Sequence, residues 1–231
     1  MRVIGVIGPK KSGKTTLICN ILKKLKDMNI DVAAVKHSFH DVEVDKEGTD
    51  SYNFKLYSNV SILADNSKTV FFYNKMNLYG ILSKLNNEFV IIEGFKEQLK
   101  ELNIPKILMV KGDEGSELLD SQTLMMIKDY NYNIDEVVEK VLEKSIVPTY
   151  SLNCGHCGYN CKLFVEKVIS GELRWNQCVM ATGVEMIVDG KTIPINPFVS
   201  QIIKNTLKGI ISSLKGVDNE PKNISINIKK I

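Results

Sequence analysis

The chain has 231 residues, more than one average domain and enough to bury a sizeable hydrophobic core. Its 30 basic and 27 acidic residues leave a formal net charge of +3, so the overall charge demands neither a nucleic acid nor an anionic membrane as partner. The amino terminus enters an apolar run at once, and no apolar run is long enough to span a bilayer. These features predict a cytoplasmic protein without a signal peptide.

The clearest motif lies near the amino terminus. An apolar run from Val3 to Ile7 has the length of a strand, and residues 17–25 carry the apolar spacing of a helix. Between them stands Gly8-Pro9-Lys10-Lys11-Ser12-Gly13-Lys14-Thr15. Strand, glycine-rich loop and helix form the context of a phosphate loop, so this stretch predicts binding of a nucleoside triphosphate.

Each fixed position of the motif has a physical role. Gly8 and Gly13 let the backbone turn so that successive N–H groups point at an anion, and the helix N-terminus adds its own free donors. Lys14 is expected to reach the outer phosphates, and the Thr15 hydroxyl to coordinate Mg²⁺.

The rest of the first 147 residues alternates between strand and helix patterns. Such alternation predicts a three-layer α/β domain with a mainly parallel sheet. One continuous apolar run, residues 89–92, is typical of a strand buried on both faces. Strands are predicted at 31–36, 60–64, 69–73, 89–92 and 107–110, and helices at 51–58, 78–85 and 134–142.

Polar residues follow two of these strands, at the edge where ligands bind in an open α/β sheet. Glu93 ends the buried apolar run and is expected to hold Mg²⁺ directly or through water, or to orient an attacking water. The alternative is an acid that merely caps the strand. His37 and His40 follow the second strand, beside Asp41, and predict either a loop that contacts phosphate or substrate or an ordinary polar loop.

A second nucleotide-type pattern, Asn74-Lys75-Met76-Asn77, resembles the guanine-reading sequence Asn-Lys-x-Asp. The amide nitrogen of Asn77 is a donor, so this side chain cannot accept both hydrogen bonds that guanine offers to a carboxylate. The residues alone therefore disfavour base reading here and leave guanine and adenine undecided.

A domain boundary is predicted at Val147-Pro148, which gives a nucleotide domain of residues 1–147 and a smaller α+β domain of residues 148–231. The apolar stripe of the last predicted helix indicates a core or oligomer face, with a membrane surface as the alternative. Predicted here are a helix over 162–170 with Gly171 as its C-cap, a hairpin over 184–195 around Asp189-Gly190, a helix from Asn196-Pro197 to Gly216, and an edge strand over 224–228.

Four of the five cysteines, Cys154, Cys157, Cys161 and Cys178, lie close together in the second part. In a reducing compartment such a cluster indicates a metal site rather than disulfides. Four thiolates can hold a 4Fe-4S cluster or a structural zinc ion. Cys19, on an apolar helix face, is predicted to be a small core residue.

Taken together, the motifs of residues 1–145 resemble the molybdopterin-guanine dinucleotide biosynthesis adaptor family, MobB. The resemblance implies a homodimer that binds GTP, hydrolyses it weakly and assists a molybdopterin guanylyltransferase in attaching GMP to molybdopterin. The motifs are the phosphate loop with Thr16, Lys36-His37-x-x-His40-Asp41, Asp45-x-x-Gly48-x-Asp50-Ser51, Glu93-Gly94-Phe95-Lys96 and Pro105-Lys106.

The resemblance also implies a set of site residues. Lys14 and Glu93 are the predicted catalytic residues, and Thr15 and Glu93 the predicted Mg²⁺ ligands. The basic stretch Pro9-Lys10-Lys11 departs from the family pattern, and its extra charge would strengthen phosphate binding or meet an acidic partner. The predicted nucleotide-binding set is Gly8, Lys11, Ser12, Gly13, Lys14, Thr15 and Thr16, with His37, Asp45 and Asp50 as motif positions without an individual role.

The cysteine spacing is similar to the four-cysteine iron-sulfur domain of corrinoid iron-sulfur proteins and of some membrane-linked electron-transfer subunits. That pattern reads Cys-Gly-x-Cys-Gly-Tyr-Pro-x-Cys. This chain reads Cys154-Gly155-His156-Cys157-Gly158-Tyr159-Asn160-Cys161, one residue shorter, followed by Cys178. The flanking matches favour a 4Fe-4S cluster over zinc, and His156 is either a group beside the ligands or an exposed loop residue.

Three functions compete at this point. The first is a GTP-binding accessory protein for molybdenum or tungsten cofactor maturation that carries a 4Fe-4S cluster. The second is a phosphate-loop kinase for a small molecule, and the third is an electron-transfer module gated by nucleotide. A kinase usually needs a mobile lid with arginines, and Arg2 and Arg174 are the only arginines in the sequence. The first function is therefore favoured.

Overall fold

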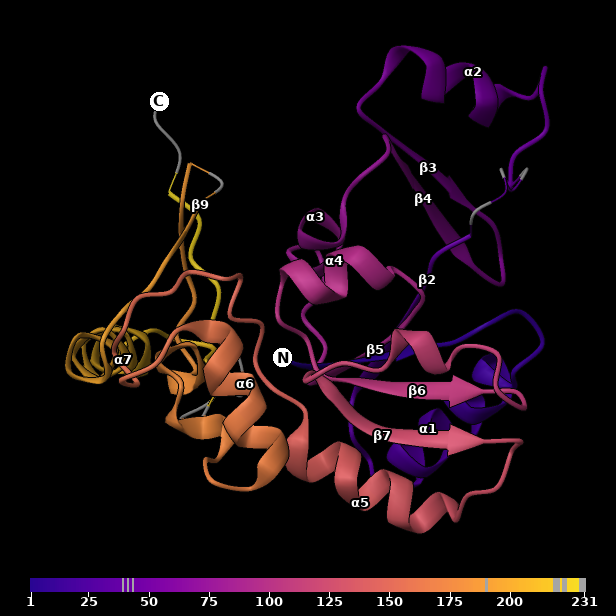
Figure 1. The fold of residues 1–231 in the computed structure, drawn as a ribbon. Coiled ribbons are helices and arrows are strands. Elements are labelled where there is room, and N and C mark those ends of the chain that lie inside the picture. The colour runs from indigo at the N-terminus through magenta and orange to yellow at the C-terminus, as the bar shows by residue number, and fades with distance from the viewer. Residues whose placement is uncertain are drawn as a thin grey trace.

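The fold is described from a computed structural model of the chain, drawn in Figure 1. The structure describes residues 1–38, 40, 42, 44–189, 191–217, 221 and 224–228. Asp41 and Gly190, which the sequence analysis names, lie outside the described residues.

Five parallel strands form the central sheet, in the order β2-β5-β1-β6-β7. The predicted parallel α/β class is confirmed. Because the strands run in one direction, their carboxyl ends meet at one edge of the sheet (Figure 1). The strands are β1 (Arg2–Ile7), β2 (Val32–Lys36), β5 (Phe89–Glu93), β6 (Lys106–Val110) and β7 (Thr123–Lys128).

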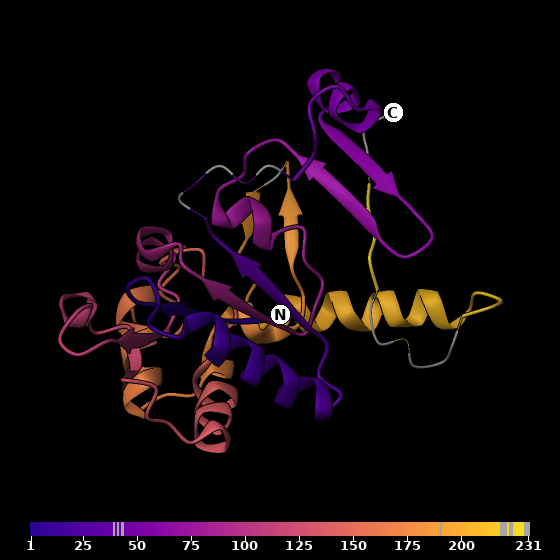
Figure 2. The same ribbon diagram turned by 90° about the vertical axis from the view of Figure 1, so that its right-hand side faces the viewer.

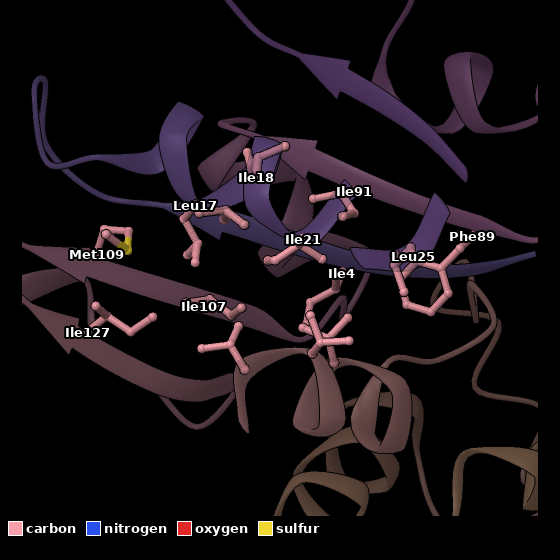
Figure 3. Packing of buried hydrophobic residues seen from close by; sticks show 14 residues of the cluster. Ile4, Leu17, Ile18, Ile21, Leu25, Phe89, Ile91, Ile107, Met109 and Ile127 are labelled. Carbon is pink, nitrogen blue, oxygen red and sulfur yellow. The ribbon is translucent and has the colours of Figure 1, made fainter. Parts of the chain in front are cut away.

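Helices cover both faces of the sheet and complete the predicted three layers. On one face α1 (Lys14–Asp27) and α5 (Ile134–Lys144) pack on β1, β5 and β6, and Figure 3 shows their apolar side chains meeting those of the sheet. On the other face lie α3 (Leu78–Leu82) and α4 (Lys96–Glu101). Alternate strand residues serve the two layers, as the side-chain period of two requires. Ile4 and Ile91 join the first cluster, whereas Val3 and Val90 join the second.

A helix and a hairpin, residues 50–73, project from this domain as an arm (Figures 1 and 2). The arm consists of α2 (Asp50–Tyr57) and the antiparallel strands β3 (Val60–Ala64) and β4 (Thr69–Tyr73). A turn at Asp65 joins the two strands, since its Oδ1 accepts the backbone N–H groups of Ser67 and Lys68. Several large apolar side chains of the arm are exposed.

The carboxyl-terminal part contains α6 (Cys161–Ser170), the hairpin β8 (Met186–Val188) and β9 (Lys191–Ile193), and α7 (Pro197–Ser212). Two short 3₁₀ turns, Trp175–Gln177 and Val179–Thr182, follow α6, and a third, Ser116–Leu118, lies between β6 and β7 of the central sheet. The predicted caps are present: Gly171 ends α6 at φ 88°, and the Asn196 side chain accepts the Val199 N–H at the start of α7.

One expectation for this part is wrong, and for the last predicted helix the core alternative is excluded, while an oligomer face stays a prediction. Residues 224–228 form no strand, because alternation alone does not supply a pairing partner, and Ile228 is 91% exposed. The stripe of α7 is not a core face either: Ser200 is the one buried residue of the helix, and Phe198 is 73% exposed. In Figure 2 the helix extends away from the central sheet. None of the described helices is long and apolar enough to cross a bilayer.

Candidate functional site

The glycine loop, residues 8–13, joins β1 to α1 at the carboxyl edge of the sheet. Gly8 has φ 148°, and a Cβ there would lie 2.2 Å from the Met109 carbonyl oxygen. Gly13 has φ 86°, and a Cβ there would lie 2.3 Å from the Tyr130 ring. Both positions therefore need glycine for the backbone angle and for the space. Ser12, which is buried, closes the loop by donating its hydroxyl to the Pro9 carbonyl oxygen at 3.0 Å.

Lys14 lies at the first turn of α1, directly after this loop. Its ammonium donates to the Pro9 carbonyl oxygen at 2.5 Å. Partial burial lowers the pKa of Lys14, and the positive charges of Lys96 and Lys36 lower it further, against the opposing effect of Glu93. The ammonium is thus held against the loop that it is predicted to complete, and its contact with phosphate stays a prediction.

Thr15 and Glu93, the two predicted Mg²⁺ ligands, are in direct contact. The Thr15 hydroxyl donates to Glu93 Oε2 at 3.0 Å, and the Glu93 side chain is only 13% exposed. They meet because β1 and β5 are parallel neighbours whose carboxyl ends share one edge. Two oxygen ligands placed side by side suit a hard cation such as Mg²⁺.

A third side chain at this point was not among the predicted site residues. Lys36 ends β2, directly opposite Glu93 in the strand register. Its ammonium lies 3.4 Å from Glu93 Oε2 and 3.4 Å from the Thr15 hydroxyl oxygen. The strand-end argument that singles out Glu93 applies equally to Lys36, so the signal was present in the sequence.

The two histidines go to different places. His40 Nε2 lies 3.2 Å from the Lys10 ammonium, which brings the loop after β2 beside the glycine loop. The His37 backbone N–H donates to the Glu93 carbonyl oxygen at 2.9 Å, and its ring packs on Phe95 with a centroid distance of 4.5 Å. His37 therefore extends the β2–β5 pairing by one residue and supports the backbone that carries Glu93.

The acidic motif positions are engaged within their own loop. Asp45 Oδ1 accepts the hydroxyl groups of Thr49 at 3.1 Å and Ser51 at 3.0 Å. Asp50 is the first residue of α2. These contacts organise the start of the arm, and a nucleotide role for Asp45 and Asp50 stays a prediction.

Loops from β6 and β7 form the other side of the glycine loop. The Tyr130 hydroxyl donates to the Lys11 carbonyl oxygen at 2.6 Å, and Asp129 Oδ1 accepts the Gly112 N–H at 2.8 Å. Tyr130 was missed because no motif marks it. Asn77, in contrast, is the N-cap of α3, where its side chain accepts the Gly80 N–H at 2.9 Å. That capping role accounts for the residue without a nucleotide base.

The four clustered cysteines line a single pocket, together with Thr149, Tyr159, Phe164 and Val179. Backbone N–H groups already point at two of the sulfur atoms: Asn153 donates to Cys161 at 3.3 Å, and Met180 to Cys178. Burial raises the pKa of the Cys178 thiol to about 11, and the other three thiols raise it in the same direction. The donor set of four sulfurs fits an iron-sulfur cluster or zinc.

The thiols are gathered but not arranged as ligands. Within the described part of the chain, no three His, Cys, Asp or Glu side chains are spaced to hold a metal ion. The loop between the first cysteines has room to adjust, since Gly155 and Gly158 have positive φ and open space around them. His156 is exposed. Cys19 is exposed as well, so the core prediction for it is wrong: α1 buries Leu17, Ile18 and Ile21 but turns residue 19 outward.

α6, whose first residue Cys161 lines the cysteine pocket, lies near the amino-terminal ends of the sheet strands, whereas the glycine loop follows the carboxyl end of β1 (Figure 1). Arg2, at the start of β1, places its guanidinium 4.8 Å from the Trp175 ring centre and donates to the Leu142 carbonyl oxygen at 2.6 Å. Ile146 packs with α6 in the same hydrophobic cluster that Cys157 and Cys178 contact. The six residues of β1, about 20 Å in length, lie between this end of the strand and the glycine loop.

Comparisons with known proteins match two separate stretches of the chain. Residues 3–129 match the family model "Molybdopterin guanine dinucleotide synthesis protein B" (MobB), and residues 151–180 match one described as "Putative Fe-S cluster". A solved structure, MobB of Bacillus subtilis, aligns over 61% of this chain and 98% of its own length at 19% identity, with a TM-score of 0.44.

Two relatives support the same assignment. A "Putative molybdopterin-guanine dinucleotide biosynthesis adapter protein" of Methanocaldococcus jannaschii is 58% identical over 99% of this chain and 97% of its own length. The "Molybdopterin-guanine dinucleotide biosynthesis adapter protein" of Haemophilus influenzae is 30% identical over 59% of this chain and 79% of its own length. The chain therefore belongs to the MobB family.

Proposed function

We propose that this protein is a GTP-binding accessory protein that assists the attachment of GMP to molybdopterin, hydrolyses GTP weakly and carries a 4Fe-4S cluster. The observation that carries the nucleotide part is the 3.0 Å contact between Thr15 and Glu93 at the end of the glycine loop. Membership of the MobB family and the name of the M. jannaschii relative support the pathway. The guanine preference rests on the family resemblance.

In the proposed site the backbone N–H groups of the glycine loop bind the phosphates, helped by the N-terminus of α1. Lys14 leaves the Pro9 carbonyl oxygen and contacts the outer phosphates. A bound Mg²⁺ would neutralise phosphate charge, and Thr15 and Glu93 supply the oxygens that would hold it. Glu93 also lies where it can orient an attacking water.

Slow hydrolysis follows from the positions of the two arginines. Fast phosphoryl transfer commonly uses an arginine that stabilises charge on the transferring group. Arg2 stands at the opposite end of β1, and Arg174 begins the 3₁₀ turn that carries Trp175. The proposed site therefore has lysine cations alone, which supports a switch or carrier rather than a kinase.

The proposed cluster ligands are Cys154, Cys157, Cys161 and Cys178, within a unit of residues 148–231 that follows the nucleotide unit of residues 1–147. A bound 4Fe-4S cluster supplies reversible one-electron chemistry. The N–H groups of Asn153 and Met180 would stabilise the thiolate forms of two ligands. Zinc remains the alternative occupant, and it would make the loop a structural staple.

The proposed homodimer has a candidate interface on the outer face of the arm. Val60 pairs with Tyr73, and Ile62 pairs with Phe71, so the four side chains lie on one face of the hairpin. They are 41%, 41%, 53% and 54% exposed, respectively. An apolar face of this kind favours a protein partner, and a second copy of the arm would match it by two-fold symmetry.

Titration calorimetry on anaerobically prepared protein tests the nucleotide proposal. With magnesium present, GTP is expected to bind at least about tenfold more tightly than ATP and to be hydrolysed slowly. Binding of neither triphosphate, or stoichiometric phosphorylation of a small acceptor, would contradict it.

Metal analysis of the same preparation tests the cluster. A brown protein with about four iron atoms per chain is expected. A colourless protein with one zinc ion would replace the cluster by the structural alternative. Mass determination by light scattering tests the dimer.

A further inference from the structure

Lys36 occupies an unusual position at the candidate nucleotide site. Its backbone is fixed, because β2 pairs with β5 up to the Lys36–Glu93 register and the next residue, His37, continues the pairing with a 2.9 Å hydrogen bond. Its side chain is 62% exposed and so can move while the backbone stays in place. The Lys36 ammonium reaches across the edge of the sheet to one oxygen at the end of β5 and to one oxygen in α1.

Those two atoms are the ones proposed to hold Mg²⁺. The Lys36 ammonium lies 3.4 Å from Glu93 Oε2 and 3.4 Å from the Thr15 hydroxyl oxygen, which are themselves hydrogen-bonded at 3.0 Å. Mg²⁺ binds oxygen at about 2.1 Å, so it would lie within the volume next to the ammonium. Two cations so close repel strongly in a site that is only partly solvated. Binding of the metal must therefore displace the lysine.

We propose that Lys36 is a phosphate-binding residue that holds the metal position with its own charge until magnesium and nucleotide arrive, and then contacts the terminal phosphate. The inference rests on the proposed function and names a residue that the motif analysis leaves without a role.

The excess of positive charge at the site explains why the displaced Lys36 ammonium would contact a phosphate. Lys36 and Lys96 lie near enough to Lys14 to lower its pKa, and Glu93 is the acidic group that raises it. Several ammonium groups around one carboxylate attract a polyanion. Lys14 belongs to α1 and Lys36 to β2, so a phosphate at this site can be contacted from two different elements. The arginines, which lie at the other end of β1, cannot make this contact.

The test compares Lys36→Gln, Lys36→Arg and the control Lys23→Gln, which removes the same charge from an exposed position further along α1. Dissociation constants are measured for a non-hydrolysable GTP analogue and for GDP, each over a magnesium titration. Lys36→Gln is expected to weaken the triphosphate analogue about tenfold or more, because a charge-assisted hydrogen bond is lost, and to change GDP affinity by less than about twofold. The same variant should need less magnesium for half-maximal GDP binding, because the competing cation is gone.

Lys36→Arg is expected to recover most of the triphosphate affinity, and Lys23→Gln to behave as the wild type. An unchanged ratio of triphosphate to diphosphate affinity in Lys36→Gln would overturn the inference, as would equal weakening of both nucleotides. Failure of the wild-type protein to bind either nucleotide is a separate result. It would refute the proposed nucleotide function itself, and the Lys36 inference with it.

Discussion

The Thr15 hydroxyl and Glu93 Oε2 lie 3.0 Å apart although 78 positions separate them in the chain. Their contact depends on β1 and β5 lying side by side with Val6 opposite Glu93. The bond ties the helix that follows the glycine loop to the end of the neighbouring strand. Substitutions at or beside this contact should therefore show which part of the nucleotide affinity depends on magnesium and which part does not.

Glu93→Gln keeps the size of the side chain and an oxygen that can still accept the Thr15 hydroxyl. We expect nucleotide binding in the absence of magnesium to persist, since the loop N–H groups and Lys14 are untouched. The gain in affinity on adding magnesium should fall at least about tenfold, and hydrolysis should fall with it. Calorimetry with and without magnesium checks this. A variant with full magnesium dependence would remove Glu93 from the metal site.

Lys14→Ala removes the ammonium that the glycine loop holds. Binding of triphosphate is expected to be abolished at concentrations that saturate the wild type, whereas iron content per chain should not change. The reason is that Lys14 follows the carboxyl end of β1, about 20 Å along the strand from Arg2, whereas the cysteine pocket is lined by residues between Thr149 and Val179. Nucleotide binding and metal analysis on one preparation measure both effects. Loss of iron in this variant would show that the two sites are not independent.

Gly13→Ala should destabilise the protein by about 1–3 kcal/mol, because φ is 86° and a Cβ would collide with the Tyr130 ring at 2.3 Å. Gly209→Ala is the matched control: it lies within α7, has no neighbour within 4 Å of the added carbon and should be neutral or stabilising by up to about 1 kcal/mol. Urea denaturation of the three proteins gives the comparison. Equal stability of the Gly13 variant and the wild type would contradict the described loop.

We expect the buried phenol of Tyr150 to make the free energy of unfolding depend on pH. Burial raises its pKa above the ordinary value of 10.0, with smaller contributions from Glu185 and Tyr79. Its contribution to stability is complete below pH 10 and declines at higher pH, because the unfolded chain releases the proton before the folded protein does. Tyr150→Phe should therefore lose less stability than the wild type above pH 10. Thermal unfolding between pH 8 and about 11 measures it, and parallel curves would contradict the burial of the phenol.

Ile62→Lys and Phe71→Lys should convert the proposed dimer to a monomer without unfolding the chain, because both side chains are more than half exposed. Ile187→Lys in β8, at 48% exposure, is the control for adding a charge to an apolar surface. Light scattering at several concentrations distinguishes the species. A monomeric wild type would refute the dimer outright.

Much of the candidate nucleotide site could be read from the sequence because its geometry is local or strand-based. The glycine loop is one continuous stretch, and Glu93 ends a strand whose four apolar residues mark an interior strand of a parallel sheet. Lys36 ends an adjacent strand and opens the Lys36-His37-x-x-His40-Asp41 motif, which gives it no role. The observed register shows that it meets Glu93. Tyr130 depends on the long-range packing of a loop, which no periodicity reports.

The strand and the helix that the sequence analysis does not predict, β7 and α4, have weak hydrophobic patterns. β7 is rich in methionine and leucine rather than β-branched residues and shows no alternation. α4 has six residues and one buried side chain, Leu99, which is too short for helical spacing to show. The tail at residues 224–228 has the opposite problem, because it alternates without a partner strand. Pairing is a property of the whole fold, and alternation reports only one strand of the pair.

The position of Arg2 has a practical consequence for purification. Its guanidinium lies near the aromatic rings of Phe89 and Trp175, at centroid distances of 5.2 Å and 4.8 Å, so Arg2 links β5 to the part of the chain that carries the cysteines. An affinity tag fused directly ahead of Met1 would disturb these contacts and weaken the packing of the cysteine-bearing part before any metal is added. Recombinant protein for iron reconstitution should therefore carry no tag directly ahead of Met1.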